Sequence, residues 1–202
     1  MKFPSNLTFL FATLLLLTGL SSCRQDITAK EMSDSVANYI YAYTSGTISK
    51  AEPIKIQLTN SVDLGLVGTE VESGVLSFSP SIAGTAVWEN EQTIIFQPSE
   101  HLPSNKNYLG KLALNKVFLN VPKEAGIFEF NFATREQHFY ISVEGLRNDP
   151  TGDEKKKQLT GWLNTADLTD NAAVEKIVEA KQNGKAFRSA GIMKRGVSSI
   201  FL

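Results

Sequence analysis

The stretch LSFSPSIAGTAVWENEQTIIFQPSEHLPSNKNY, from Leu76 to Tyr108, contains several short runs typical of β-strands. Apolar and polar residues alternate in short runs, and Gly, Pro, Asn and Ser separate the runs. Period-2 alternation bounded by such residues is typical of half-buried β-strands. Pro80 and Gly84 are placed to form a corner, and Leu102 and Pro103 turn the chain toward Tyr108. The stretch therefore predicts consecutive short strands of an all-β unit.

The same alternation continues on both sides of this stretch. In PIKIQLTN, Ile54, Ile56 and Leu58 share one face, and in GIFEFNFAT three phenylalanines share one face. In NYIYAYTSG, strict alternation puts Tyr41 and Tyr43 on one face, opposite Ile40, Ala42 and Thr44. Residues 38–135 are sufficient for one immunoglobulin-like antiparallel β-sandwich. We expect its core to contain five large aromatic side chains: Phe78, Trp88, Phe96, Tyr108 and Phe130.

A second pattern begins after residue 135. Phe139 to Leu146 and about Gln158 to Asn164 are predicted strands, and Asp170 or Asn171 is a candidate N-cap of a helix that ends near Gly184. The residues at helical spacing are Val174, Ile177, Val178 and Lys181. Two strands and one helix cannot close a sandwich, so residues 136–185 are expected to be an incomplete second domain with one helix.

Residues 186–202 are expected to form an irregular tail. This segment contains Arg188, Lys194 and Arg195 but no acidic residue. We interpret it as a truncated or frame-shifted end, because the second domain is left open. The alternative is a basic tail that binds a partner.

The amino terminus carries the only cysteine of the chain, at the end of an apolar run. Lys2 precedes the run Phe9 to Leu20, which is too short for a transmembrane helix and typical of a secretory signal. Leu20-Ser21-Ser22-Cys23 resembles the bacterial lipobox, in which cleavage falls between Ser22 and Cys23 and the thiol accepts a diacylglycerol. We predict a signal peptide at 1–22, lipidation of Cys23 and a polar tether at 23–37; the alternative is an ordinary secretory signal with a chance cysteine.

Lipidation implies a location and a partner. Two or three acyl chains at Cys23 would anchor the protein stably, whereas a single chain binds membranes only marginally. Residue 24 is Arg, not the Asp that, by resemblance to bacterial sorting signals, favours retention at the inner membrane. The expected location is therefore the cell envelope, with the outer membrane preferred over the inner membrane.

The order of motifs around the quoted stretch carries a family resemblance. Phe78-x-Pro80, Gly84-x-x-x-Trp88, Thr93-x-x-Phe96-x-Pro98 and Leu102-Pro103-x-x-x-x-Tyr108 follow a bacterial Ig-like pattern. With the lipobox before it and LTGWLNTADLTDNAAVEKIVEAKQNGK after it, the chain resembles the amino-terminal part of bacterial alpha-2-macroglobulin lipoproteins. The resemblance covers residues 35–185 and implies a first macroglobulin-type domain at 38–135 and the start of a second at 136–185.

The resemblance implies a function for the family. Its members are thought to trap proteases after cleavage of a bait segment, and many carry an internal thioester in a Cys-Gly-Glu-Gln setting. No cysteine follows Cys23, so this chain cannot form a thioester. The first hypothesis is therefore the membrane-anchored amino-terminal module of such an endopeptidase inhibitor, with proteases as partners of the whole protein. The alternative is a free-standing Ig-like surface lipoprotein that binds a glycan or protein, with Tyr41 and Tyr43 as an aromatic platform.

The residues suggest no active site, cofactor, metal or small-molecule substrate. His101 and His138 lack neighbouring ligands at metal-binding spacing, and the hydroxyls of Ser45 to Thr47 lack a paired base. The acidic segment Asn148 to Lys157 could form a calcium loop but lacks EF-hand spacing, so a solvated turn is preferred. A net charge of −1 and a pI near 6.2 argue against nucleic-acid binding. We expect a protein that is not an enzyme.

Overall fold

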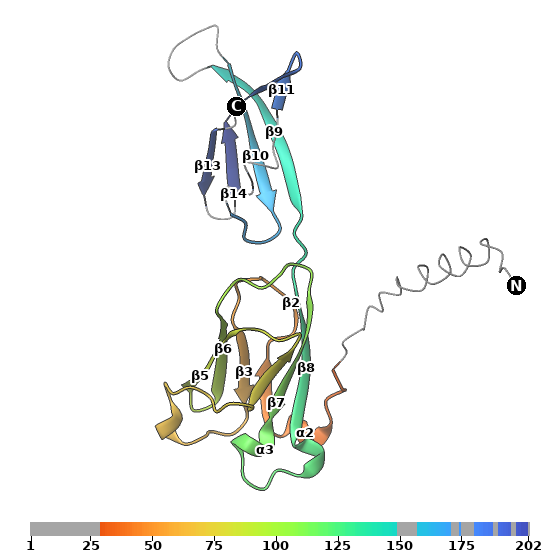
Figure 1. Ribbon diagram of the computed structural model, residues 1–202, viewed down its shortest axis with the longest axis vertical. Coiled ribbons are helices and arrows are strands. Elements are labelled where there is room, and N and C mark those ends of the chain that lie inside the picture. The colour runs from red at the N-terminus through yellow and green to blue at the C-terminus, as the bar shows by residue number, and fades with distance from the viewer. Residues whose placement is uncertain are drawn as a thin grey trace, which may run out of the picture.

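The computed structural model describes residues 29–148, 157–170, 174, 180–187, 190–194 and 197–201. Its fold is mostly β and sandwich-like, and the strands form two units that follow one another along the chain (Figure 1). Residues up to 135 belong to the first unit, and the second begins with strand β9. The all-β expectation is confirmed at this level.

Two four-stranded sheets make up the first unit. One sheet has the order β1-β3-β6-β5, formed by Ile40–Tyr43, Ile54–Leu58, Thr93–Pro98 and Gly84–Asn90. The other has the order β2-β8-β7-β4, formed by Gly46–Ile48, Ile127–Thr134, Asn107–Ala113 and Leu76–Ser79. All pairings are antiparallel except that β2 runs parallel to β8, so the expectation of a purely antiparallel sandwich is wrong at this edge. The sequence does not predict β2, because its three residues contain one apolar side chain, Ile48.

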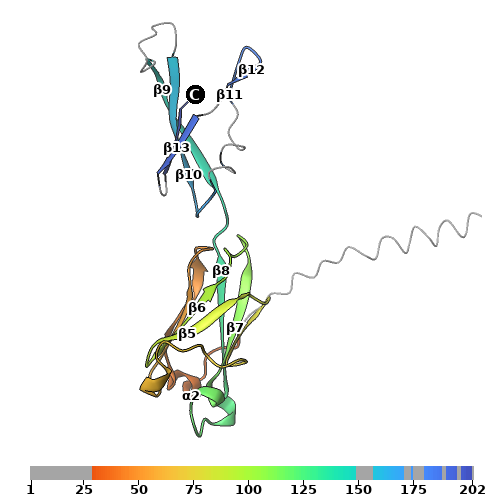
Figure 2. The same cartoon turned by 60° about the vertical axis from the view of Figure 1, so that its left-hand side comes forward.

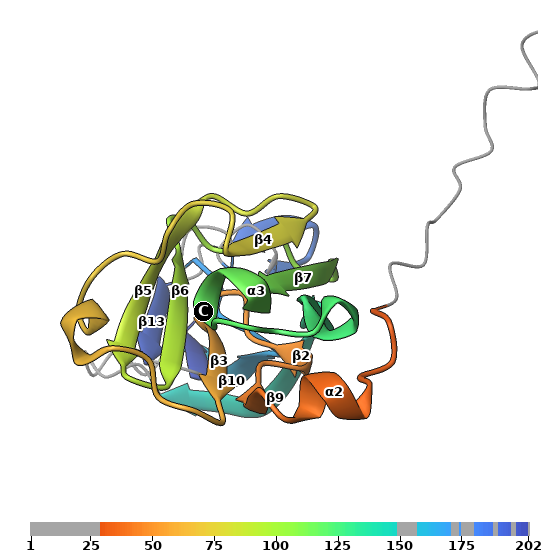
Figure 3. The ribbon, with the colours of Figure 1, turned by 90° about the horizontal axis from the view of Figure 1, so that it is seen from below.

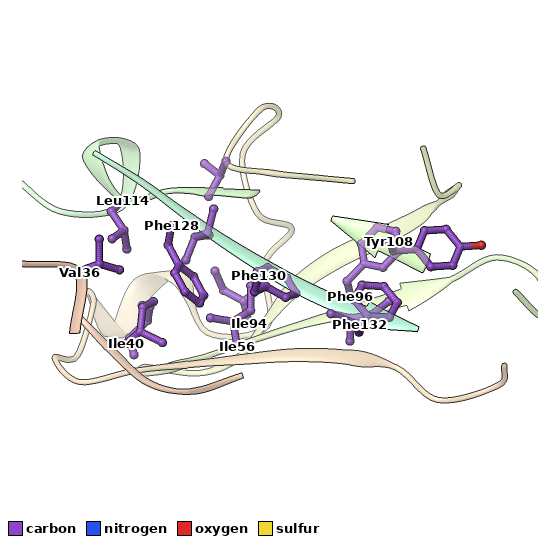
Figure 4. Close-up of a cluster of buried hydrophobic side chains, with 14 of the residues drawn as sticks. Val36, Ile40, Ile56, Ile94, Phe96, Tyr108, Leu114, Phe128, Phe130 and Phe132 are labelled. Carbon is purple, nitrogen blue, oxygen red and sulfur yellow. The ribbon is translucent and has the colours of Figure 1, made fainter. Parts of the chain in front are cut away.

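The core lies between these two sheets (Figure 4). Trp88, Phe96, Tyr108 and Phe130 are buried as predicted, and Phe78 is partly buried with its ring centroid 4.7 Å from that of Phe96. Burial raises the pKa of the Tyr108 hydroxyl, whose ring stacks on Phe132 at 5.1 Å. Aromatic pairs at such separations add stabilisation to the hydrophobic effect of burial.

Alternation along β3 and β8 is confirmed. Ile54, Ile56 and Leu58 are buried on β3, and β8 buries its three phenylalanines, Phe128, Phe130 and Phe132. Residues of β8 that point away from the core, such as Glu129, face the outer side of the sheet. This is the pattern expected where one face of a sheet is buried and the other is solvated.

The predicted corner joins the two sheets. The chain leaves β4, which belongs to one sheet, and after Pro80 to Ala83 enters β5, which belongs to the other. Gly84 begins β5 opposite Pro98, and a Cβ atom there would lie 2.6 Å from Cζ of Phe96. A side chain at residue 84 would therefore collide with the core.

Strand β1 departs from simple alternation. Its register with β3 shifts between Ile40 and Ala42, so Tyr41 is an extra residue of a β-bulge. The bulge turns Tyr43 toward the core, where its ring lies 5.0 Å from Phe128, while Tyr41 is 73% exposed. The prediction that these two tyrosines share a face is wrong, because one inserted residue reverses the facing of those that follow it.

Short helices gather at one end of the first unit, and Figure 3 views the molecule from that end. They are α2 (Asp34–Ala37), η2 (Leu64–Leu66), α3 (Leu114–Val117) and η3 (Lys123–Ala125). Val36 of α2 is buried in the core, so the packed structure starts inside the segment that the sequence assigns to a polar tether, residues 23–37. Within the described part of the chain, no helix is long and apolar enough to cross a membrane.

The second unit lies beyond the opposite end of the sandwich (Figure 2). Its sheet has the order β13-β14-β10-β9, formed by Ala190–Lys194, Val197–Phe201, Lys157–Thr165 and Phe139–Asn148. The strands predicted near 139–146 and 158–164 are confirmed. The prediction of an irregular tail at 186–202 is wrong, because β13 and β14 form a hairpin whose second strand pairs with β10.

The prediction that a helix extends from residue 170 to about Gly184 is wrong at its carboxyl end, where the structure has a β-hairpin. Val174 is helical and buried, whereas Ile177 and Val178 lie outside the described residues. Lys181 belongs to strand β11 (Ala180–Gln182), which pairs with β12 (Lys185–Phe187). Asn183 and Gly184 both have positive φ, at 50° and 78°, which is the geometry of a two-residue hairpin turn.

Candidate functional site at the junction of the two units

The described residue with the most convergent polar contacts lies where the two units meet. Asp167 follows β10 of the second unit and is 7% exposed. Its carboxylate accepts a hydrogen bond from the Ser49 hydroxyl at 2.5 Å and from the Lys50 backbone N–H at 2.8 Å, both in the first unit. The backbone N–H of Leu168 donates a third bond at 2.8 Å. One carboxylate therefore joins the end of β10 to the turn after β2.

The hydrogen bonds control the charge of Asp167. Burial by itself would raise the pKa of this carboxyl, because it disfavours the charged form. The bonds from Ser49, Lys50 and Leu168, together with the nearby positive charge of Arg135, outweigh burial and hold the pKa below its ordinary value. Asp167 is thus a carboxylate at neutral pH, and each bond to it is charge-assisted.

Gln137 supports Asp167 from the connection between β8 and β9. Its side-chain carbonyl accepts from the Asp167 backbone N–H at 3.1 Å, and its amide donates to the Asp167 carbonyl at 3.3 Å and to the Thr169 hydroxyl at 2.5 Å. The segment after β10 is therefore bonded through the backbone of Asp167 as well as through the Asp167 carboxylate.

Backbone bonds complete the junction. Arg135 donates through its guanidinium to the Ala166 carbonyl at 3.1 Å and through its backbone N–H to the Ile48 carbonyl at 2.9 Å. The backbone N–H of Ala166 donates to the His138 carbonyl at 2.8 Å. Three separate chain segments, at 48–50, 135–138 and 165–169, are therefore bonded to one another. The arrangement limits bending between the two units.

This geometry differs from that of a Ser-His-Asp triad. In a Ser-His-Asp triad the imidazole stands between hydroxyl and carboxylate and takes the serine proton. Here the Ser49 hydroxyl donates directly to Asp167. The His138 side chain is exposed and lies 3.4 Å from Glu136, with which it can form an ion pair. The site can fix an orientation, and neither histidine of the described residues is hydrogen-bonded to the Ser49 hydroxyl.

The residues singled out from the sequence fall in several places. Ser22 and Cys23 lie outside the described residues, as does most of the acidic segment between Asn148 and Lys157. His101 is exposed and lines an open cavity of about 590 Å³ with Lys50 and the residues that follow β6. In the described ranges no group of three or more His, Cys, Asp or Glu side chains is placed to bind a metal ion.

The aromatic platform suggested for the surface-binding alternative is not formed. Tyr41 is exposed, and Tyr43 packs against Phe128 and Phe130. The bulge in β1 separates the two rings, so they cannot stack on one ligand from a common face.

Sequence reasoning did not find Asp167 or Gln137. Asp167 lies in the polar run TADLTD, which reads equally well as the start of a helix. Ser49 precedes it by 118 residues, so no local spacing reveals their contact. An Asp two residues after the end of a strand is too common a feature to identify a junction.

Comparisons with known proteins add little to this geometry. No protein-family model matches the chain, and no curated protein sequence matches it. Among solved structures, L,D-transpeptidase 3 of Mycobacterium tuberculosis has 8% sequence identity and a TM-score of 0.32, with 63% of this chain and 44% of that chain covered. A second L,D-transpeptidase structure, from strain H37Rv, has 9% identity and a TM-score of 0.32, with 63% and 48% covered.

A third structure is L,D-transpeptidase 3 with a faropenem-derived adduct. It has 8% identity and a TM-score of 0.35, with 79% of this chain and 54% of that chain covered. This chain therefore spans about half the length of the structures that it matches. At these TM-scores the similarity supports no argument about activity.

Proposed function

We propose that this chain is a lipoprotein of the bacterial cell envelope, anchored through Cys23, and that it forms the amino-terminal module of a protease-trapping lipoprotein of the alpha-2-macroglobulin type. In this role the chain performs no catalysis. It tethers the trapping body to the membrane, with the outer membrane preferred because Arg24 follows the cysteine. Proteases are the partners of the whole assembly.

One observation carries the proposal: the chain enters the first unit at one end and leaves it at the other. Residues 30–33 and α2 lie at the end with the short helices, and β8 leads from that end to the junction (Figure 1). Eight strand residues, Ile127–Thr134, span about 26 Å. A module whose connections lie at opposite ends keeps the membrane anchor that precedes it apart from the domains that follow it.

The strand order supports a macroglobulin-type, immunoglobulin-like assignment of the first unit. In the constant-type immunoglobulin sandwich, strands A, B, E and D form one sheet and C, F and G form the other. If β1 and β3 to β8 are lettered A to G in chain order, the observed sheets have these same members. β2 is an additional short strand beside β8.

The junction supports the role of a spacer. A spacer holds its two ends at a fixed separation only if its units do not bend freely. At the junction, hydrogen bonds of Asp167, Gln137 and Arg135 connect three chain segments. Linked domains without a substantial interface are expected to move relative to one another. The hydrogen bonds to Asp167 oppose that motion.

The second unit offers a surface for a neighbouring domain. Strand β9 is exposed along most of its length, and its exposed large apolar side chains are Phe139, Tyr140, Ile141, Val143 and Leu146. Contiguous apolar surface on a sheet usually packs against another protein surface. We assign β9 and β10 to the start of a second macroglobulin-type domain, which packs on the domain beside it through Phe139, Ile141 and Val143, the alternate residues on one face of β9.

Cross-linking in cells tests this assignment. A photoreactive amino acid at Val143, which is 61% exposed, should attach the chain to a protein built of further macroglobulin-type domains. The same probe at Ser77, an exposed residue of β4, serves as the control and should give little of that product. A product at Val143 that is a glycan or a protein without such domains would contradict the proposal and favour a free-standing surface lipoprotein.

A further inference from the structure

The exposed apolar side chains of the first unit are concentrated at one end. Within residues 29–135, every exposed large hydrophobic side chain except Tyr41 belongs to the segments at the end with the short helices: Met32, Leu64, Leu66, Val67, Leu119 and Ile127. Leu119 is 92% exposed, in the loop between α3 and η3 (Figure 3). A single exposed leucine is ordinary, whereas a cluster at one end indicates an interaction surface.

Three of these residues lie where the chain enters the unit. Met32 and Ile127 line the same cavity of about 240 Å³, which also includes Lys123 of η3. Leu119 belongs to the loop that leads into η3. We call Met32, Leu119 and Ile127 the apolar tip.

The tether fixes how far this tip can stand from a lipid on Cys23. The Lys30 backbone N–H donates to the Glu129 carboxylate at 3.3 Å, and Glu129 also forms an ion pair with Lys111 at 2.6 Å. The hydrogen bond from Lys111 lowers the pKa of Glu129, so the carboxylate that holds the tether is charged. Six residues lie between Cys23 and Lys30, and the seven Cα–Cα steps of a fully extended chain reach about 25 Å.

We propose that the apolar tip inserts into the interfacial region of the membrane to which Cys23 is attached. This inference rests on the proposed function, because the lipid on Cys23 sets the distance. Side chains of peripheral proteins enter this region to a depth of about 5–10 Å. Contact at the tip, together with the tether, would orient the sandwich so that its junction points away from the bilayer.

The charge around the tip indicates which lipid it needs. Lys30 and Lys123 line the cavity at the tip together with Glu31, Glu124 and Glu129, and Lys111 forms an ion pair with Glu129. A balanced border gives little attraction to anionic headgroups, in contrast to a polybasic segment. Insertion should therefore be as strong in zwitterionic as in anionic membranes and insensitive to salt.

Fluorescence quenching on tethered protein tests the inference. Cys23, the only cysteine, allows the chain from Cys23 to Leu202 to be coupled to a maleimide-bearing lipid in phosphatidylcholine vesicles. Leu119→Trp reports on the tip, and Glu100→Trp, exposed between β6 and β7 at the opposite end, is the control. After subtraction of the fluorescence of the parent chain, which contains Trp88 and Trp162, lipids brominated along their acyl chains should quench the added Trp at residue 119 several-fold more than that at residue 100. Equal quenching would overturn the inference, and so would quenching that requires anionic lipid or disappears in salt.

Hydrogen exchange removes the concern that tryptophan itself drives insertion. Backbone amides of residues 118–121 in the otherwise unaltered chain should exchange several-fold more slowly when it is coupled to vesicles than when it is free. Leu119→Ser should abolish the difference, and its persistence in that variant would contradict insertion of the tip. Because the coupling is chemical, neither result depends on lipid processing in cells. Failure of the tip to insert is thus distinguishable from failure of Cys23 to be lipidated.

Discussion

The carboxylate of Asp167 accepts a hydrogen bond from the Ser49 hydroxyl across 118 residues of sequence, and this contact joins the second β-unit to the first. The neighbouring Lys50 N–H donates to the same carboxylate. Because Asp167 is nearly inaccessible to solvent, water cannot readily replace these partners. Asp167 therefore contributes to the relative orientation of the two units, together with Gln137 and Arg135, and it can be altered without changing the core of the first unit.

Asp167→Ala should loosen the junction. Hydrogen bonds to a charged group contribute about 1.5–3 kcal/mol each, and their loss is partly compensated by water. We expect the free energy of local opening to fall by about 2 kcal/mol. The Lys50 and Leu168 amides should then exchange their hydrogens faster, and small-angle X-ray scattering should report a wider distribution of shapes.

Asp63→Ala is a matched control. Asp63 also accepts a backbone bond, from Gly65, but it lies in the segment that contains η2, away from the junction. Its replacement should leave exchange at Lys50 unchanged. Equal exchange in the Asp167 variant and the parent chain would show that the junction is held by other contacts.

Acidification should release the same contact. The pKa of Asp167 is lower in the folded protein than its ordinary value of 3.8, so its stabilising contribution is fully present above that value. The contribution is lost as the pH falls through the depressed pKa, because the protonated carboxyl no longer makes charge-assisted bonds. Exchange at Lys50 should accelerate with falling pH, after correction for the intrinsic rate.

Asp167→Asn separates this effect from other acid-sensitive groups. Glu129 also has a lowered pKa, so the parent chain is expected to lose stability through more than one carboxylate. In the Asn variant the acid-dependent part of exchange at Lys50 should be small. A pH dependence identical to that of the parent chain would assign the effect to a group other than Asp167.

Gly110→Val should destabilise the first unit strongly. Gly110 pairs with Phe130 across β7 and β8, and the Phe130 ring lies over its backbone, leaving no room for a Cβ atom. Phe130 is 1% exposed and contacts other core rings, so it cannot move aside freely. Overpacking of this kind costs about 1–3 kcal/mol or more, measurable as a lower midpoint of denaturant unfolding.

The double variant Gly110→Ala with Phe130→Leu identifies the cause. A shorter side chain at residue 130 leaves space for the new methyl group, so the two changes together should cost less than the sum of their separate effects. Gly65→Ala, where the nearest atom to the new Cβ is 3.4 Å away, should change stability little. Additive costs in the double variant would mean that the two residues do not collide.

Adjacent residues of β8 should respond very differently to truncation. Phe128 is 1% exposed in the core, so Phe128→Ala should lower the free energy of unfolding by about 3–5 kcal/mol. Ile127 is 57% exposed, so Ile127→Ala should change it by no more than about 0.5 kcal/mol. Similar losses at both positions would contradict the assigned facing of this strand.

Much of the first unit could be predicted because its strands are regular. β3 and β8 bury one face each, and their apolar residues therefore alternate in the sequence as they do in the structure. The corner between β4 and β5 could also be predicted, since Pro80 and Gly84 have few alternative uses at that spacing. Where one face of a strand is buried and the other is exposed, the alternation of apolar and polar residues is sufficient to predict the strand.

The errors occurred where one local signal permitted two structures. The extra residue Tyr41 creates a bulge, and alternation alone cannot indicate an insertion. Gly184 predicts the end of a helix, although Asn-Gly, the pair at residues 183 and 184, is also preferred in a two-residue hairpin turn. The strands after residue 189 depend on pairing with β10, a contact that short segments do not reveal.

The candidate site could not be predicted, because it is assembled from distant segments. The residues next to Asp167, Gln137 and Ser49 in the sequence form no recognisable motif. Their role at the junction arises only because the fold brings the three side chains together. The proposed lipidation of Cys23 differs from this case, because the pattern that predicts it is contained in a few adjacent residues.

The most direct test of the account is metabolic labelling with radioactive palmitate in cells that produce the full chain. Label should enter the wild-type protein, which should fractionate with membranes, and Cys23→Ser should carry none. Incorporation into the Ser variant, or an unlabelled wild-type protein released from the membrane fraction, would contradict an anchored spacer.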